Sequence, residues 1–279
     1  MKHIIKAEGI IMEIGINLYP KWPYKEVIRA FLENGIKRTF VNLEHPEFEK
    51  AMDALADAGI VVDNFHAPFK GLNVIWEPGE AGEEMLRKLM AGVDACVKYG
   101  VKVMVGHVSN GKPMPPIIPV ALERYDKLMA YAAEKGVTIA FESHRFVENV
   151  AYFMERYPQA GFCLDTSHED AFTPGVRYMP MWGHRLVATH LSDNEYVCDY
   201  DMHMLLFDGH IDWGQTAREL AGCGRDVTLM LEIKPDNHEK YKDVSIKDYY
   251  AAAAESIKRF GEMVENCKAE FDGAACDKA

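Results

Sequence analysis

The chain has 279 residues, 48% of them hydrophobic, and a formal net charge of −12. This charge argues against sequence-independent binding of DNA or RNA, which depends mainly on Lys and Arg contacts to phosphates. No apolar run approaches the roughly 20 residues needed to span a bilayer, so we expect no membrane partner. The six cysteines include no C-x-x-C pair, which favours reduced thiols and a cytoplasmic protein.

Strand-like and helix-like segments alternate along the chain. The eight predicted strands are nearly continuous apolar runs, which is typical of a parallel sheet buried on both faces. These strands are Met12–Leu18, Arg38–Leu43, Ile60–Phe65, Val101–Val105, Val137–Phe141, Gly161–Leu164, Leu186–Thr189 and Val227–Leu231. The predicted helices are Lys25–Asn34, Pro46–Ala58, Glu80–Tyr99, Ile117–Lys135, Val147–Tyr157, Trp213–Ala221 and Ile246–Lys268.

Glycines punctuate three helix ends directly before a strand, at Gly59, Gly100 and Gly136, as helix C-caps should. An irregular stretch, 173–183, follows the sixth strand. The chain has no Gly-rich nucleotide-binding motif, so nucleotide-binding folds lack their signature. The number of repeats and the length predict an α/β fold, a single (β/α)8 TIM barrel over residues 1–270. Residues 271–279 are expected to form a flexible tail.

Acidic and imidazole side chains follow the predicted strands at their carboxyl ends, where the reactive groups of α/β barrels lie. In chain order they are His66, His107, Glu142, Asp165, His168, His190, Asp201, His203 and Glu232. The strand ends of a parallel barrel converge on one rim. Carboxylates gathered there repel one another unless protons or a cation neutralise them. The sequence therefore predicts a divalent metal at this rim.

Three short motifs resemble those of the xylose isomerase-like barrel superfamily: LDTSH, THLSDNE followed by D-x-H, and the LE pair of the last strand. The superfamily contains sugar isomerases, ketose 3-epimerases, inosose dehydratases and the type IV apurinic endonucleases. The resemblance covers residues 12–268. The order and spacing of the motifs are specific to the superfamily and much less specific to one reaction.

The resemblance implies a principal metal site made of Glu142, Asp165, His190 and Glu232. Three carboxylates and one imidazole favour Mn²⁺ or Mg²⁺, with Zn²⁺ or Co²⁺ as alternatives. In family members that act on ketoses, the metal holds two adjacent substrate oxygens. Glu142 and Glu232 would then act as acid and base in a proton transfer through an enediolate. His168 would hydrogen-bond a substrate oxygen.

Glu148 lies six positions after Glu142, where ketose 3-epimerases have a Glu that contacts the substrate. Those epimerases also have an Arg six positions after the metal His, where this chain has Tyr196, so other isomerisations stay open. The resemblance implies either of two roles for His66, His107, Asp201 and His203. They complete further sites for up to three zinc ions, as in the apurinic endonucleases, or they line the pocket of a single-metal enzyme.

The loops around the predicted rim are acidic or neutral, and the nearby cations are few. Two of them, Arg145 and Lys234, are expected to be solvated surface charges. A small sugar, polyol or sugar phosphate therefore fits better than a nucleic acid. We predict a metal-dependent sugar isomerase or epimerase. The alternatives are a keto-polyol dehydratase and an endonuclease-like multi-zinc phosphodiesterase, and a homo-oligomer is left open.

Overall fold

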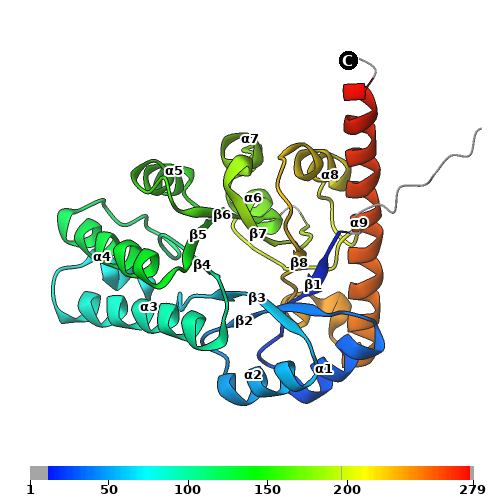
Figure 1. The fold of residues 1–279 in the computed structure, drawn as a ribbon, viewed down its shortest axis with the longest axis horizontal. Coiled ribbons are helices and arrows are strands. Elements are labelled where there is room, and N and C mark those ends of the chain that lie inside the picture. The colour runs from blue at the N-terminus through cyan, green and yellow to red at the C-terminus, as the bar shows by residue number, and fades with distance from the viewer. Residues whose placement is uncertain (1–11, 196, 277–279) are drawn as a thin grey trace, which may run out of the picture.

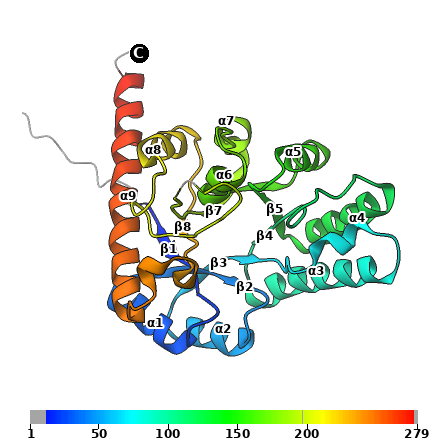
Figure 2. The same cartoon turned by 180° about the vertical axis from the view of Figure 1, so that it is seen from behind.

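The computed structural model describes residues 12–195 and 197–276, and Tyr196 and the end of the predicted tail lie outside these residues. Parallel strands occupy the centre and helices surround them (Figures 1 and 2). The strands are β1 (Ile14–Ile16), β2 (Arg38–Asn42), β3 (Val61–His66), β4 (Val103–Gly106), β5 (Thr138–Glu142), β6 (Gly161–Asp165), β7 (Leu186–His190) and β8 (Leu229–Leu231). Each predicted strand is therefore present, and the first and last strands, β1 and β8, are shorter than predicted.

The helices are α1 (Tyr24–Glu33), α2 (Phe48–Asp57), α3 (Glu80–Tyr99), α4 (Pro119–Lys135), α5 (Val147–Arg156), α6 (Thr166–Phe172), α7 (Met179–Trp182), α8 (Trp213–Gly222) and α9 (Ile246–Cys276). The stretch 173–183, predicted to be irregular, contains α7. The long helix α9 stands beside α8 and passes residue 271, where the tail was expected to begin (Figure 1).

The predicted helix C-caps are confirmed. Gly100 and Gly136 cap α3 and α4 in the left-handed conformation, with φ of 72° and 67°. Gly59 follows α2 with φ of 66°. Residues with a Cβ are strained at these angles, so the glycines end each helix and turn the chain into the next strand. Among the described residues, no helix is both long enough and apolar enough to cross a bilayer.

The eight strands do not form one continuous ladder. β2 to β7 make a six-stranded parallel sheet in chain order, and β1 pairs with β8 in a separate two-stranded sheet. Isolated hydrogen bonds cross the two seams: Leu18 N donates to Phe40 O at 3.1 Å, and Leu191 N donates to Met230 O at 2.7 Å. The sequence predicted a closed eight-stranded sheet, and the structure differs from that prediction at both seams.

Two threonine hydroxyls explain the seams. Oγ1 of Thr39 in β2 donates to Ile16 O in β1 at 2.7 Å. Oγ1 of Thr189 in β7 donates to Thr228 O at 3.0 Å and accepts from Met230 N at 2.9 Å. Each hydroxyl satisfies a backbone group that a neighbouring strand would otherwise have to satisfy. The strands therefore stay adjacent while few ladder bonds connect them directly.

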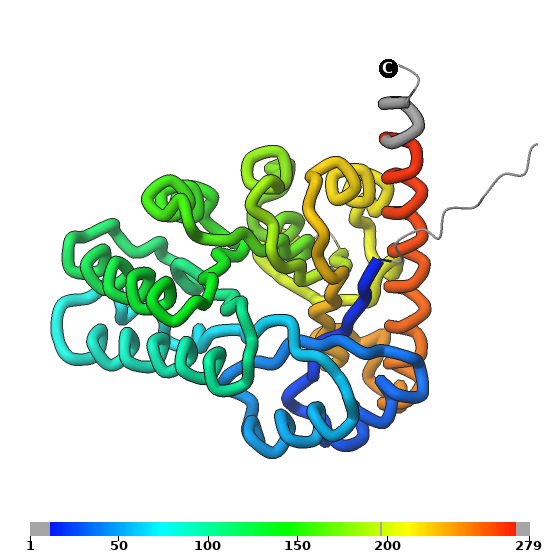
Figure 3. The backbone as a smooth tube through the Cα atoms, viewed as in Figure 1, coloured from blue at the N-terminus to red at the C-terminus, as the bar shows by residue number. Residues whose placement is uncertain are grey.

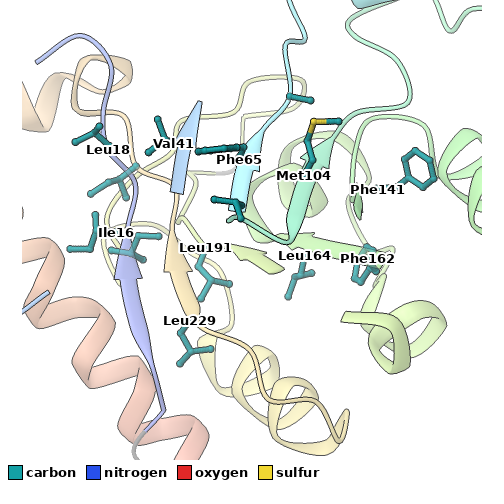
Figure 4. Packing of buried hydrophobic residues seen from close by; sticks show 14 of the residues in the cluster. Ile16, Leu18, Val41, Phe65, Met104, Phe141, Phe162, Leu164, Leu191 and Leu229 are labelled. Carbon is teal, nitrogen blue, oxygen red and sulfur yellow. The ribbon is translucent and has the colours of Figure 1, made fainter. Parts of the chain in front are cut away.

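Side chains of the strands that face the helices form the larger of two buried apolar clusters (Figure 4). This cluster includes Phe65, Phe141, Phe162, Leu164 and Leu229, none of them more than 1% exposed. Burial of apolar surface contributes roughly 25 cal/mol per Å². The outward side chains of the strands thus pack against the helices. The inward side chains are not needed for this packing and can include polar residues.

The inward side chains form a thin second cluster with one small or medium residue from each of four neighbouring strands: Val105, Ala140, Cys163 and Ala188. Side chains alternate between the two faces of a strand. The residues two positions further along therefore share the inner face: His107, Glu142, Asp165 and His190. The strands that build the core thereby carry these four ligand-type side chains to the same rim.

Candidate metal centre

Four side chains meet at the carboxyl ends of β5, β6, β7 and β8: Glu142, Asp165, His190 and Glu232. We call them the central cluster. One ligand atom from each lies within 4.8 Å of the others. Nδ1 of His190 lies 2.8 Å from Oε1 of Glu142 and 3.1 Å from Oε2 of Glu232. All four residues are buried, so three carboxylates share one water-poor space.

His66 and His107 approach the other oxygen of Glu142. Nε2 of His66 lies 3.4 Å and Nε2 of His107 lies 2.8 Å from Oε2. Nδ1 of His66 contacts the carbonyl oxygen of Ala67 at 2.8 Å and must donate to it, so the tautomer with a single N–H presents the lone pair of Nε2 to the carboxylate. A lone pair and a carboxylate oxygen repel unless a proton or a cation lies between them.

His168, Asp201 and His203 form a third group of ligand-type atoms within 4.8 Å of one another. Nε2 of His168 lies 3.3 Å from Oδ2 of Asp201, and Nε2 of His203 contacts the same oxygen. Both rings are oriented from behind by backbone carbonyls. Nδ1 of His168 donates to Ser143 O at 3.0 Å, and Nδ1 of His203 donates to Glu232 O at 3.1 Å. Such contacts behind a ring fix the direction of its other nitrogen.

The carboxylates of the central cluster differ in how strongly they hold a proton. Burial opposes ionisation of Glu142, but His190 and His107 hold its pKa well below the usual value. Burial raises the pKa of Asp165 well above its usual value, and the charge of Glu142 adds to this effect while His168 opposes it. Asp165 is therefore the carboxyl group from which a bound cation would have to displace a proton.

Two histidines near the cluster have opposite pKa shifts. Burial lowers the pKa of His107 to about 4, so its ring is neutral near pH 7. Burial also opposes the charge on His168, but Asp165 and Asp201 raise its pKa to about 10. A neutral imidazole can bind a metal, whereas a charged one can donate a hydrogen bond to a substrate oxygen.

The unsatisfied atoms of the cluster fit a divalent cation. Among the described residues, Oδ2 of Asp165 and Nδ1 of His107 are buried and have no hydrogen-bond partner, and Nε2 of His107 and Oε2 of Glu142 lie 2.8 Å apart without hydrogen-bond geometry. Orphaned polar atoms of this kind cost free energy and require an explanation. Metal–ligand distances of about 2.0–2.3 Å place opposite ligand atoms roughly 4–4.5 Å apart, which agrees with the observed cluster.

Figure 3 shows the course of the backbone between β7 and α8. One buried carboxylate, that of Asp193, organises this connection. Oδ2 of Asp193 accepts a hydrogen bond from Phe207 N at 2.9 Å and from Nε1 of Trp213 at 2.8 Å. Its Oδ1 accepts from Ile211 N at 3.1 Å. The loop is thereby folded back on its own start, which holds the segment 201–203 at the rim.

The structure corrects the prediction for both cations that were expected to be solvated. The side chain of Arg145 is only 14% exposed and pairs with Asp199. Lys234 was expected to be a solvated surface charge, but its Nζ lies 3.3 Å from Oε1 of Glu232 and contacts Nε2 of His203. The signal was present in the sequence, because Lys234 follows Glu232 by two positions and therefore lies on the same face of the extended chain.

Other residues at the rim were missed or are placed differently. Cys163 lies with Glu142 and His190 in one ligand-type group, and His144 lies with two histidines in another. Both follow from strand alternation around Glu142 and Asp165, a signal that the sequence contained. Glu148 lies exposed in the first turn of α5 and, among the described residues, belongs to none of these groups. The prediction that it contacts substrate therefore has no support from this geometry.

Residues 24–260 match the family described as Xylose isomerase-like TIM barrel. The chain belongs to this family. A relative from Sinorhizobium fredii (strain NBRC 101917 / NGR234), named Uncharacterized protein y4fM, is 29% identical over 262 residues, which covers 81% of this chain and 82% of the relative. The fold expectation is thereby supported at the level of the TIM-barrel fold.

Solved structures of similar fold include proteins with named activities or bound metal. The IOLI protein with a binding zinc atom has a TM-score of 0.73 and 18% identity, over 91% of this chain and 99% of that protein. An L-ribulose 3-epimerase has a TM-score of 0.70 and 14% identity, over 94% and 98%. A D-allulose 3-epimerase from Methylomonas sp. has a TM-score of 0.68 and 16% identity, over 89% and 97%. At these identities the likeness shows the fold.

Proposed function

We propose that the chain is a divalent-metal-dependent isomerase or epimerase of a small sugar, polyol or sugar phosphate. One observation carries the proposal: Glu142 and Glu232 come from different strands and both face Nδ1 of the same buried imidazole, His190. Two carboxylates around one centre can serve as the base that removes a proton and the acid that returns it. The epimerases among the proteins of similar fold support the same reaction class.

In this proposal, Glu142, Asp165, His190 and Glu232 would hold one divalent cation, which would supply the positive charge that polarises a substrate carbonyl and makes the neighbouring C–H more acidic. Either Glu142 or Glu232 takes the proton from that carbon, and the other carboxylate delivers a proton to the product. His168, whose pKa is raised to about 10, donates a hydrogen bond to the oxygen that gains negative charge.

The cations near the rim support a small substrate over a polyanion. Lys112 and Arg145 both pair with the carboxylate of Asp199 in the β7–α8 connection. Neither contributes an unpaired charge to a basic groove. Binding of a nucleic acid depends on such free cations, whereas binding of a sugar depends on a few directed hydrogen bonds.

Solvent exchange tests this proposal directly. The metal-loaded protein is incubated in D₂O with a panel of ketoses, aldoses and their phosphates, using Mn²⁺, Mg²⁺, Zn²⁺ or Co²⁺. We expect deuterium to appear at the carbon next to the carbonyl of at least one substrate. Loss of water from a keto-polyol instead would assign the dehydratase alternative, which uses the same metal and base. No exchange and no elimination with any substrate would contradict the proposal.

A second candidate, a multi-zinc phosphodiesterase, is favoured by the two additional ligand-type groups around the central cluster. His66 and His107 lie against one oxygen of Glu142, and His168 and His203 lie against one oxygen of Asp201. Cleavage of a DNA duplex that contains an abasic site, measured with zinc-loaded protein, would replace the isomerase by this candidate. We expect no cleavage.

A further inference from the structure

Lys234 contacts the nitrogen of His203 that would bind a metal in the group formed by His168, Asp201 and His203. Its Nζ contacts Nε2 of His203. An ammonium group has no lone pair, so Nε2 is the acceptor in this contact. The same nitrogen also contacts Oδ2 of Asp201, so the ammonium is the cation beside this lone pair and this carboxylate. The rest of the ring agrees, because Nδ1 of His203 contacts the carbonyl oxygen of Glu232 at 3.1 Å and must carry the hydrogen.

A metal in this group would need the same lone pair. Zinc binds an imidazole nitrogen at about 2.0–2.1 Å along that direction, so an ammonium hydrogen and a metal cannot both use it. The ammonium is also held from a second side, because Oε1 of Glu232 lies 3.3 Å from Nζ. Lys234 therefore contacts a residue of the central cluster. A dication that displaced the Lys234 ammonium would break its contacts with both His203 and Glu232.

We propose that Lys234 is a built-in cation that closes the group of His168, Asp201 and His203 to metal. The proposal rests on the proposed function in one respect, the metal at the central cluster. It makes that function more specific, because a site that cannot bind a metal at His168, Asp201 and His203 cannot hold the three metal ions of a trinuclear phosphodiesterase. The ammonium then supplies one positive charge where a metal would supply two.

The test compares metal uptake by wild type, K234M and K234R. Each protein is titrated with Zn²⁺ and dialysed, and bound metal is counted by mass spectrometry. Binding of Co²⁺ is followed in parallel by its visible spectrum. We expect K234M to bind one ion per chain more than wild type, because methionine keeps the stem but removes the charge. K234R keeps the charge and should bind as wild type does.

Two controls locate the effect. K242M removes a positive charge from the same β8–α9 connection, where exposed Lys242 pairs with Glu239 at 3.4 Å, and should leave metal uptake unchanged. The double variant K234M/H203Q should lose the additional ion and its cobalt spectrum. Circular dichroism and urea unfolding show that each variant is folded before metal is counted.

The outcomes separate this inference from the proposed function. Equal uptake of one or more ions by wild type and K234M overturns the inference alone, and so does an additional ion that persists in K234M/H203Q. A wild-type protein that binds no divalent metal overturns the proposed function, and the role of Lys234 with it. Gain of one ion in K234M only, with K234R and K242M unchanged, supports both.

Discussion

The ring of Phe40 in β2 stacks on the imidazole of His190 in β7, with 4.2 Å between the ring centroids and 19° between the ring planes. This contact holds the imidazole in the orientation that presents Nδ1 to Glu142 and Glu232. Phe40→Leu keeps an apolar side chain but removes the flat contact. We expect divalent-metal affinity, measured by isothermal titration calorimetry, to fall by about 10- to 100-fold, as for the loss of other contacts that orient a ligand.

A matched aromatic residue provides the control. Phe48 begins α2 and packs against Phe65 and Tyr99, away from the central cluster. Phe48→Leu loses a similar amount of apolar contact and should leave metal affinity as it is in wild type. Equal affinities in wild type, Phe40→Leu and Phe48→Leu would show that stacking on His190 does not orient a ligand.

Glu232→Gln tests the assignment of acid and base. The amide keeps the shape of the side chain but cannot take a proton, so turnover should fall by about 10²- to 10⁴-fold, the usual contribution of a positioned proton-transfer group. Deuterium exchange into the substrate measures this step. Glu239→Gln is the control, since Glu239 is exposed on the same β8–α9 connection. Full exchange activity in Glu232→Gln would remove this residue from the mechanism.

Metal binding should weaken as the pH falls. Burial raises the pKa of Asp165 above its usual value, so the metal-free protein keeps a proton there at a pH where an ordinary Asp is ionised. A metal must displace that proton, so affinity rises with pH and binding releases protons. Calorimetry in buffers of different ionisation enthalpy counts the protons. If metal binding released no protons at any acidic pH, Asp165 would not be the group that loses a proton to the metal.

Asp193→Asn should unfold the protein more easily and weaken metal binding. The Asp193 carboxylate accepts from three backbone or indole N–H groups across the β7–α8 connection, among them Nε1 of Trp213. The amide replaces one acceptor oxygen with a donor that faces other donors. We expect the free energy of unfolding, measured in urea, to fall by about 3 kcal/mol, the scale of a buried unsatisfied donor.

Asp199→Asn is the control for the same loop. Asp199 is 44% exposed and pairs with Lys112, which is 58% exposed, and with Arg145, which is 14% exposed. Exposed ion pairs contribute little to stability because water and salt screen them. The free energy of unfolding should therefore change much less than in Asp193→Asn. Similar losses in both variants would show that Asp193 does not organise the loop.

The positions of the main site residues could be predicted because two local rules determine them. Apolar runs predict the strands, three of them directly after a Gly-capped helix end, and alternation along each strand places Glu142, Asp165 and His190 on the inner face. The parallel order of the strands then brings that face to one rim. These rules use only neighbours in the sequence, so a single sequence contains the signal.

The features that the sequence did not reveal depend on contacts between distant segments. Thr39 and Thr189 break the ladder because their hydroxyls meet carbonyls of β1 and of the segment before β8, and nothing in the local sequence shows this. Alternation along the chain could have placed Lys234 beside Glu232, but its second partner, His203, is far away in the sequence and no local rule reveals that contact. Glu148 is exposed because the direction of α5 depends on its packing, which spacing from Glu142 does not determine.

The most direct measurement is anomalous diffraction from crystals of the wild-type protein soaked in Mn²⁺. Our account predicts a manganese peak enclosed by Glu142, Asp165, His190 and Glu232, and no peak beside His203 where Lys234 lies. A density map with no peak among these four side chains, or with manganese bound only elsewhere, would contradict the central claim.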